Sequence, residues 1–222
     1  MVVADIEEEK RRAAEAAAEL VEAGMTVGLG TGTTVAYLLP APARRRLDIR
    51  CVATSPATAD KARSPGLDVA SFTGIDSLDL AVDGADQMDP AGWLVNRGGG
   101  AHTREKIVAG AAERFVVIIS SDKVVDALVA PVPLELLAFG IDATLRVVGD
   151  ARLSAAPPSP DGGVLAGYFG PLDDPTALAR RLSAAPGVVE HGLFPPNMVS
   201  EILVGQAGGV QRRRIGAGKP GG

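Results

Sequence analysis

Short apolar segments alternate with polar or amphipathic segments over the first half of the chain. The apolar segments are residues 25–30 (MTVGLG), 48–55 (DIRCVATS), 67–72 (LDVASF), 78–86 (LDLAVDGAD) and 114–120 (RFVVIIS). Nearly continuous apolar runs of this length are typical of strands in a sheet whose two faces are both covered by helices. We therefore predict that residues 1–129 form an α/β unit, an open and mostly parallel Rossmann-like sheet with helices on both faces.

A helix is predicted at the start of this unit, from Ile6 to about Ala23. Asp5 followed three residues later by Glu8 has the spacing of a capping box. Gly24 is the expected C-terminal stop, because glycine readily takes the left-handed conformation that ends a helix.

The pattern changes after Pro131-Val-Pro133. Residues 134–149, 161–170, 174–185 and 187–194 predict strands and helices in α+β order, and residues 155–163 predict a turn-rich connection. We expect residues 130–204 to form a smaller α+β domain. The segments SEILVG and VQRRRI are expected to return to the first sheet, so that residues 205–222 join residues 1–129. The last six residues, AGKPGG, are expected to be disordered.

Composition narrows the classes of function. The net charge of −5 and the sequence pI of about 5.1 lack the basic footprint of a nucleic-acid-binding protein. The single cysteine, Cys51, excludes an intrachain disulfide and suits a reducing compartment. The acidic N-terminus does not have the order of a signal peptide, and no apolar run approaches the length of a bilayer span. We expect a cytoplasmic protein with no membrane and no nucleic-acid partner.

A glycine- and threonine-rich segment, GLGTGTT (residues 28–34), lies between a predicted strand and a predicted helix. Glycines allow close approach of the backbone to a ligand, and the N–H groups at the helix start favour an anion. The hydroxyls of Thr31, Thr33 and Thr34 have a spacing suited to a phosphate. Because the dinucleotide fingerprint is only half present, a monophosphate fits better than a dinucleotide. The alternative is a tight turn without a ligand.

Three carboxylates and one cation are brought to the same sheet edge by residues 82–106. Asp83 and Asp86 follow a predicted strand, and Arg97 precedes the glycines Gly98–Gly100. Glu105 then lies in the first turn of a predicted helix. Close carboxylates disfavour joint ionisation, so that one holds a proton while the other serves as base. The competing interpretations are a simple Asp-Gly turn and a capping glutamate.

Two lysines and two histidines complete the candidates. Lys123, in the segment SSDK, stands at a predicted strand–helix junction where it reaches an anionic ligand, and Lys10 lies on the polar face of the first helix. Both have a simpler interpretation as solvated lysines. His191 is expected to be structural, and His102 to influence Glu105 at most indirectly. Neither has metal-ligand spacing with Cys51, so no metal site is predicted.

Taken together, these segments resemble ribose-5-phosphate isomerase of type A over nearly the whole chain. The resemblance rests on GLGTGTT, VDGAD, NRGGGAHTREKIV, SSDK, PVPLEL and PGVVEHGLF, in order and at matching separations. It implies an aldose–ketose isomerase that interconverts ribose 5-phosphate and ribulose 5-phosphate without a metal or cofactor. It also implies an α/β domain with a small α+β domain, and a homodimer or homotetramer.

The resemblance also assigns roles to individual residues. Glu105 falls on the catalytic base, which carries a proton between C1 and C2, and Asp83, with Asp86 beside it, assists ring opening and proton movement among the oxygens. Arg97 falls on a lysine that stabilises the enediolate. The residues implied to bind substrate or its phosphate are Thr31, Gly32, Thr33, Thr34, Gly98, Gly99, Lys10 and Lys123.

Two other functions stay open from the sequence. One is the same proton transfer on a modified sugar phosphate in a specialised pathway. The other is a sugar-phosphate-binding module that does not catalyse, against which stand the presence of both Glu105 and Asp83 and the lack of an appended helix-turn-helix segment.

Overall fold

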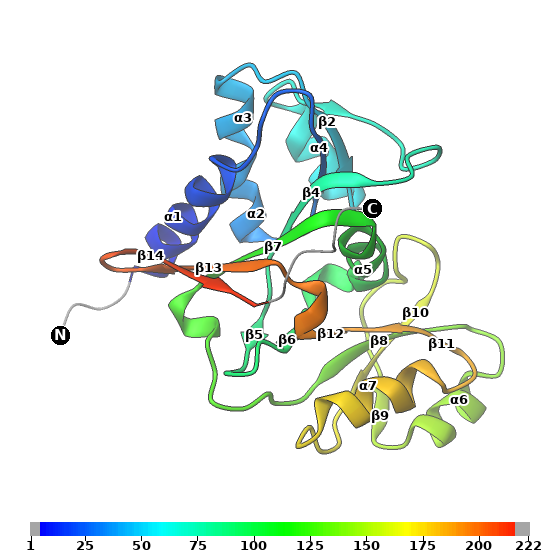
Figure 1. Ribbon diagram of the computed structural model, residues 1–222. Coiled ribbons are helices and arrows are strands. Elements are labelled where there is room, and N and C mark those ends of the chain that lie inside the picture. Colours follow the sequence, from blue (N-terminus) through cyan, green and yellow to red (C-terminus); the bar gives the residue numbers. More distant parts are fainter. Residues whose placement is uncertain (1–4, 216–222) are drawn as a thin grey trace.

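The computed structural model describes residues 5–215, and it contains three sheets (Figure 1). The largest has seven strands in the order β14-β13-β7-β4-β1-β2-β3. Its parallel strands are β1 (Thr26–Leu29), β2 (Arg50–Ala53), β3 (Asp68–Val69), β4 (Leu78–Asp83), β7 (Ala112–Ser120) and β13 (Glu201–Gln206), and β14 (Gly209–Arg214) is an antiparallel edge. The prediction of an open, mostly parallel sheet is confirmed, as is the return of the last two strands to it.

Both faces of this sheet are buried, which explains the continuous apolar strands. Along β7, Val116 and Ile118 pack on one face, whereas Val117 and Ile119 pack on the other. The first face is covered by α1 (Ile6–Ala18), α2 (Thr33–Leu38), α3 (Pro40–Arg44) and α4 (Pro56–Arg63), and the second by α5 (His102–Ala111). Alternate residues of one strand thus serve two separate cores.

The other sheets belong to the second half of the chain and to its junction with the first. The four-stranded antiparallel sheet has the order β11-β8-β10-β9, from β8 (Val132–Leu136), β9 (Ala151–Leu153), β10 (Val164–Tyr168) and β11 (Val188–His191). Figure 1 shows α6 (Ile141–Val148) and α7 (Pro175–Ser183) beside it, away from α1–α4. The three-stranded sheet joins β12 (Leu193–Phe194), β6 (Leu94–Val95) and β5 (Gln87–Met88). The proposed domain limits, 129/130 and 204/205, stay a prediction.

The first helix is shorter than predicted. The Asp5 side chain accepts a hydrogen bond from the Glu8 N–H, as expected of the cap, but α1 ends at Ala18. Gly24 does not cap it, because its N–H donates to the carbonyl of Asp48, outside the helix. The expected disorder of the C-terminal tail concerns residues outside the described part of the chain.

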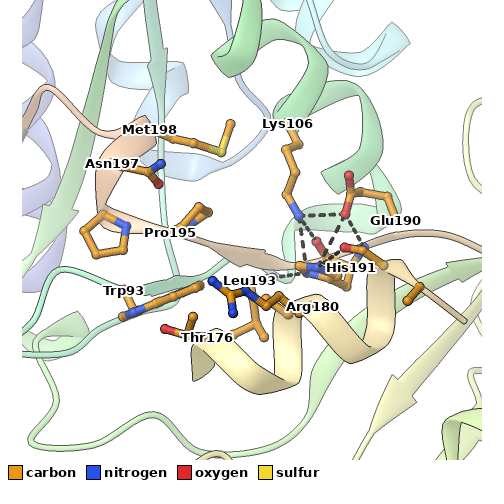
Figure 2. A pocket seen from close by; sticks show the side chains of 14 residues that line it. Trp93, Lys106, Thr176, Arg180, Glu190, His191, Leu193, Pro195, Asn197 and Met198 are labelled. Atoms are coloured by element: carbon orange, nitrogen blue, oxygen red, sulfur yellow. Dashed lines mark hydrogen bonds and ion pairs between the residues drawn. The ribbon is translucent and has the colours of Figure 1, made fainter. Parts of the chain in front are cut away.

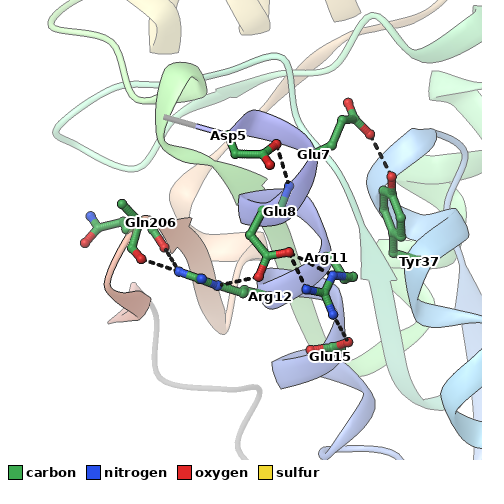
Figure 3. Close-up of polar contacts among 9 residues, drawn as sticks. Asp5, Glu7, Glu8, Arg11, Arg12, Glu15, Tyr37 and Gln206 are labelled. Carbon is green, nitrogen blue, oxygen red and sulfur yellow. Dashed lines mark hydrogen bonds and ion pairs between the residues drawn. The ribbon is translucent and has the colours of Figure 1, made fainter. Parts of the chain in front are cut away.

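The polar face of α1 connects this helix to the sheet edge (Figure 3). Arg12 donates to the carbonyls of Gln206 (2.9 Å), the last residue of β13, and of Ala207, which follows it. Glu7 accepts from the Tyr37 hydroxyl of α2 (2.8 Å). None of the helices in residues 5–215 has the length and apolar character that a bilayer span requires.

Candidate functional site

The site lies at the carboxyl end of β4, between β1 and β7 in the middle of the large sheet. Asp83 is the last residue of β4, and its Oδ1 accepts a hydrogen bond from the Gly84 N–H (2.7 Å). Gly30, after β1, makes room for this carboxyl, because a Cβ there would lie 1.9 Å from Asp83 Oδ1. The glycine loop is therefore required for packing against Asp83, whether or not it binds a ligand.

Glu105 reaches the same place from the first turn of α5. The residues before the helix, Gly98–Gly100, form a 3₁₀ turn (η1), and Gly99 and Gly100 have positive φ angles of 55° and 75°. A Cβ at Gly100 would also lie 2.4 Å from Leu165, so both backbone conformation and space require glycine there. The turn directs α5 so that Glu105 points back to β4, where it is 1% exposed and Asp83 is 3% exposed.

Asn96 joins the two carboxyls, and the sequence had not singled it out. Its Nδ2 donates to Glu105 Oε2 (2.9 Å) and lies 3.5 Å from Asp83 Oδ2 and 3.4 Å from the Gly84 carbonyl oxygen. Within residues 5–215, neither Asp83 nor Glu105 forms an ion pair with a lysine or arginine. The pair is thus held by a neutral amide.

Burial without a counter-ion shifts the acidity of both carboxyls. It raises the pKa of Asp83 to about 8; the N–H groups of Gly84 and Thr31 oppose this shift, and the Asp86 charge adds to it. Burial, followed by the charge of Asp83, raises the pKa of Glu105 well above its usual range. The raised pKa values let these carboxyls keep protons at pH values where ordinary carboxyls have lost them, which suits a site that gives and takes protons.

A cavity of about 150 Å³ opens beside the pair and gathers most of the predicted binding residues. Its lining includes Lys10, Thr31, Gly32, Thr33, Thr34, Asp86, Asn96 and Lys123. Lys10 comes from α1, and Lys123 comes from the 3₁₀ turn η2 (Ser121–Lys123), which stands where the sequence predicted the start of a helix. Glu9 holds the two elements together, because its Oε2 accepts from both the N–H (2.9 Å) and the hydroxyl (2.7 Å) of Ser121. Two cations from distant parts of the chain thereby face one cavity.

Thr31 and Asp86 contribute differently from the other lining residues. The Thr31 hydroxyl belongs to a cluster with Thr54, Ser55 and Thr58 at the start of α4, at 2.8–3.2 Å, so its side chain fixes the loop to that helix. Asp86 Oδ2 accepts a hydrogen bond from the Arg97 N–H (2.6 Å), which ties the end of β4 to the glycine turn.

Arg97 and Gly99 lie on another side of the turn. The Arg97 guanidinium donates to the carbonyls of Pro131 (Nε, 3.0 Å) and Val129 (Nη2, 3.0 Å). Arg97 and Gly99 line a separate cavity of about 360 Å³. The structure therefore does not bring the Arg97 side chain to the two carboxyls. Asn96 and Arg97 follow a strand, where neighbouring side chains point to opposite sides, so the sequence shows that only one of the two faces the carboxyls but not which one.

A larger cavity, of about 880 Å³, contains a different polar cluster (Figure 2). Lys106 Nζ donates to Glu190 Oε1 (2.7 Å) and to the His191 carbonyl (2.5 Å), and Ser183 Oγ lies 3.1 Å from His191 Nε2. The other ring nitrogen, Nδ1, accepts from the Leu193 N–H (3.2 Å), so Nε2 carries the proton and donates it to Ser183. This histidine cannot take a proton from the serine, which excludes a Ser-His nucleophile in the resting arrangement.

His102 is a buried residue at the start of α5. It is fully buried, and burial lowers its pKa, which favours the neutral ring. In the described part of the chain, no group of three His, Cys, Asp or Glu side chains is placed to hold a metal ion.

Comparison with known proteins points to one family. The family model for ribose 5-phosphate isomerase A (phosphoriboisomerase A) matches residues 50–209. Ribose-5-phosphate isomerase A of Caulobacter vibrioides (strain NA1000 / CB15N) is 44% identical over 222 residues, covering 93% of this chain and 97% of the relative. The protein of the same name from Gluconobacter oxydans (strain 621H) is 39% identical over 224 residues, covering 93% and 96%.

A solved structure agrees in fold and length. A D-ribose-5-phosphate isomerase in complex with phospho-erythronic acid superposes with a TM-score of 0.88 at 32% sequence identity. The match covers 95% of this chain and 99% of that one.

Proposed function

Since this chain belongs to the ribose 5-phosphate isomerase A family, we propose that it interconverts D-ribose 5-phosphate and D-ribulose 5-phosphate through an enediolate. The observation that carries the proposal is the buried Asp83–Glu105 pair beside a cavity lined by Lys10 and Lys123. A proton-transfer group and an anion site are the two parts that the isomerisation of a sugar phosphate requires.

Glu105 acts as the base in this proposal. In the open-chain aldose its carboxylate takes the proton from C2, and the electron pair of that bond forms the C1–C2 double bond of the enediolate. The same carboxyl returns the proton to C1, while a proton passes from O2 to O1 and leaves the carbonyl at C2. Asp83, which is protonated near neutral pH, is placed to handle the proton on the oxygens, and Asp86 lies beside it.

The phosphate is assigned to the cavity of about 150 Å³. Lys10 and Lys123 supply positive charge, and the hydroxyls of Thr33 and Thr34 and the backbone of Gly32 supply donors. Thr31 acts through its backbone. Gly98 and Gly99 allow the turn to approach the sugar, and Arg97 acts by fixing that turn to the carbonyls of Val129 and Pro131. No metal or cofactor enters the proposed reaction.

We also propose that the chain works in the cytoplasm as a homo-oligomer. Phe139 is 94% exposed, and Leu137, directly after β8, and Val189, within the edge strand β11 of the four-stranded sheet, are also exposed. Exposed apolar side chains on and near an edge strand suit contact with a second copy of the chain, in a homodimer or homotetramer. Light scattering on the purified protein measures this mass directly.

The test of the proposed function is ribulose 5-phosphate formation from ribose 5-phosphate by the purified protein. Glu105→Gln should lower kcat by at least about 10³-fold, because it removes the base and keeps the shape of the side chain. Binding of phospho-erythronic acid, measured by calorimetry, should persist. Glu113→Gln, which changes an exposed glutamate on β7, is the control and should keep wild-type activity. A wild-type protein that binds a pentose phosphate without turnover would show that the chain is a binding module.

A further inference from the structure

Asn96 occupies the position in the site where a charged side chain was expected. It follows β6, is 5% exposed, and lies between the cavity of about 150 Å³ and the carboxyls. Its short hydrogen bond goes to Glu105 Oε2 at 2.9 Å, and a longer approach of 3.5 Å goes to Asp83 Oδ2. One amide thus contacts one oxygen of each carboxyl.

The two oxygens of Glu105 are left in different environments by this contact. Oε2 is held by Asn96, whereas Oε1 is buried and makes no hydrogen bond in the described structure. The lone pairs of Oε1 are therefore available to accept a proton, while the fixed Oε2 sets the rotation of the group. We propose that Asn96 is a positioning residue, which holds Oε2 and thereby presents Oε1 as the oxygen that exchanges the substrate proton. This inference rests on the proposed function.

The neighbouring residue explains why Asn96 has this place. Arg97 sends its guanidinium away to the carbonyls of Val129 and Pro131, so the extended segment turns Asn96 inward. The groups facing Glu105 from the surrounding elements are Asp83 and Asp86 at the end of β4 and the Thr31 N–H after β1. Since both side chains among them are acidic, Asn96 is a donor that favours the charged form of the base.

Removing the Asn96 amide should therefore change the pH at which Glu105 ionises, in addition to any change in the stability of the fold. In Asn96→Ala the titration of Glu105 should move upward by about one pH unit, because a hydrogen bond to a charged group is lost. In Asn96→Asp the shift should be larger, since a fourth carboxyl joins those of Asp83, Asp86 and Glu105. Asn96→Ser, which keeps a shorter donor, should lie between wild type and Asn96→Ala, and it serves if the alanine variant does not fold.

A matched control is provided by Gln87. It is another buried amide near the site, and it pairs with the backbone of Val129 through its Nε2 (2.9 Å) and Oε1 (2.7 Å) without contacting Asp83 or Glu105. Gln87→Ala should lower the melting temperature and leave the titration of Glu105 at its wild-type position.

The experiment uses two readouts on the same proteins. One is the carboxyl ¹³C titration of Glu105, assigned by its absence in Glu105→Gln, and the other is the pH profile of kcat for ribose 5-phosphate. In Asn96→Ala, kcat should fall by up to about 10-fold on the acidic side of the profile, which moves with the titration of Glu105, and recover as the pH rises. Unchanged titration and an unchanged profile in Asn96→Ala, with only a loss of stability as in Gln87→Ala, would overturn the inference. A wild-type protein without turnover at any pH would instead refute the proposed function, while the titration would still decide whether Asn96 holds Glu105.

Discussion

Glu105 and Lys106 are neighbours on α5, and they enter two buried polar clusters of opposite kind. Consecutive helical residues point about 100° apart, so Glu105 faces β4 and Lys106 faces β11. The first cluster contains the carboxyls of Asp83, Asp86 and Glu105 with the amide of Asn96, and it contains no cation. The second contains Lys106, Glu190 and His191, in which acid and base are paired (Figure 2).

The paired cluster has the character of a structural joint. Burial raises the pKa of Glu190, but the charge and hydrogen bond of Lys106 outweigh burial and hold it below the usual range. Lys106 is more deeply buried, and burial lowers its pKa in spite of the pair. Its ammonium also lies 5.0 Å from the centre of the Phe194 ring. The cluster links α5, on the seven-stranded sheet, to β11 of the four-stranded sheet. Within it the Lys106 ammonium is paired with the Glu190 carboxylate and donates to the His191 carbonyl.

In the unpaired cluster the buried carboxyls have no counter-ion, and burying them in this way lowers the stability of the fold. Folded proteins retain such an arrangement where chemistry requires a carboxyl that titrates near neutral pH. The comparison therefore separates two uses of buried ionisable groups on a single helix: Lys106 stabilises the joint between the sheets, and Glu105 is kept in an environment that favours proton transfer.

The largest expected effect on stability comes from breaking the paired cluster. Lys106→Met should lower the free energy of unfolding by about 2–3 kcal/mol, because it removes the ion pair to the partly exposed Glu190 and the charged donor of the His191 carbonyl. Urea unfolding followed by circular dichroism measures this change. Lys61→Met, at an exposed position on α4, should stay within about 0.5 kcal/mol of wild type.

A double variant sharpens this test. Adding Glu190→Gln to Lys106→Met removes the uncompensated charge and should restore part of the loss. If Lys106→Met costs no more than Lys61→Met, then the cluster is not a joint and the contrast with Glu105 is wrong.

In the unpaired cluster, removing an ionisable side chain is expected to raise the stability of the fold, not to lower it. The pKa of Asp83 is about 8 in the folded protein, above its value in the unfolded chain. As the pH rises from about 4 to about 8, the unfolded state releases a proton that the folded state keeps, so stability falls over this range. Asp83→Asn cannot ionise, and it should gain about 2 kcal/mol over wild type at pH 8 and little at pH 4. This gain in stability is smaller than the whole pKa shift of Asp83 would give, because the side-chain amide of asparagine accepts the hydrogen bond of the Gly84 N–H less well than the aspartate carboxyl does.

Thermal unfolding at pH 4, 6 and 8 provides the measurement, and the same variant should lose isomerase activity. Asp76→Asn, at an exposed position before β4, is the control and should run parallel to wild type at all three values. A pH-independent difference between Asp83→Asn and wild type would mean that Asp83 is ionised in the fold like an ordinary aspartate.

The fold could be predicted from local patterns, because these patterns report burial on two faces. Residues 114–120 are apolar at every position but the first and last, and β7 is buried by α1 on one face and α5 on the other. The end of α1 could not be predicted in the same way. Gly24 is a residue type typical of a helix C-cap, but its N–H donates to the backbone carbonyl of Asp48, 24 residues away in the chain.

The sequence allowed the carboxylates of the site to be predicted, but not all of the groups that donate hydrogen bonds or positive charge to it. Asp83 and Glu105 could be found because a strand end and a glycine turn place them, and both features are local. Asn96 was missed because the charge of Arg97 drew the prediction to the adjacent position. Only the packing of Arg97 against the carbonyls of Val129 and Pro131 decides which of the two neighbours faces inward. The lysines Lys10 and Lys123 share a cavity through Glu9, a contact between distant segments.

The smallest expected effect comes from the exposed ion pairs of α1, and it tests whether burial is what distinguishes Lys106. Among residues 5–215, Arg11 pairs only with Glu8 and Glu15 of its own helix, whereas Arg12 also donates to the carbonyls of Gln206 and Ala207 at the end of β13 (Figure 3). Arg11→Ala should change the melting temperature by less than about 1 °C, since water screens pairs within one exposed face. Arg12→Ala should lower it by about 2–4 °C, because it releases the helix from the sheet edge. An Arg11→Ala loss as large as that of Lys106→Met would show that ion pairs stabilise this protein regardless of burial, and the contrast between the two clusters on α5 would then rest on Glu105 alone.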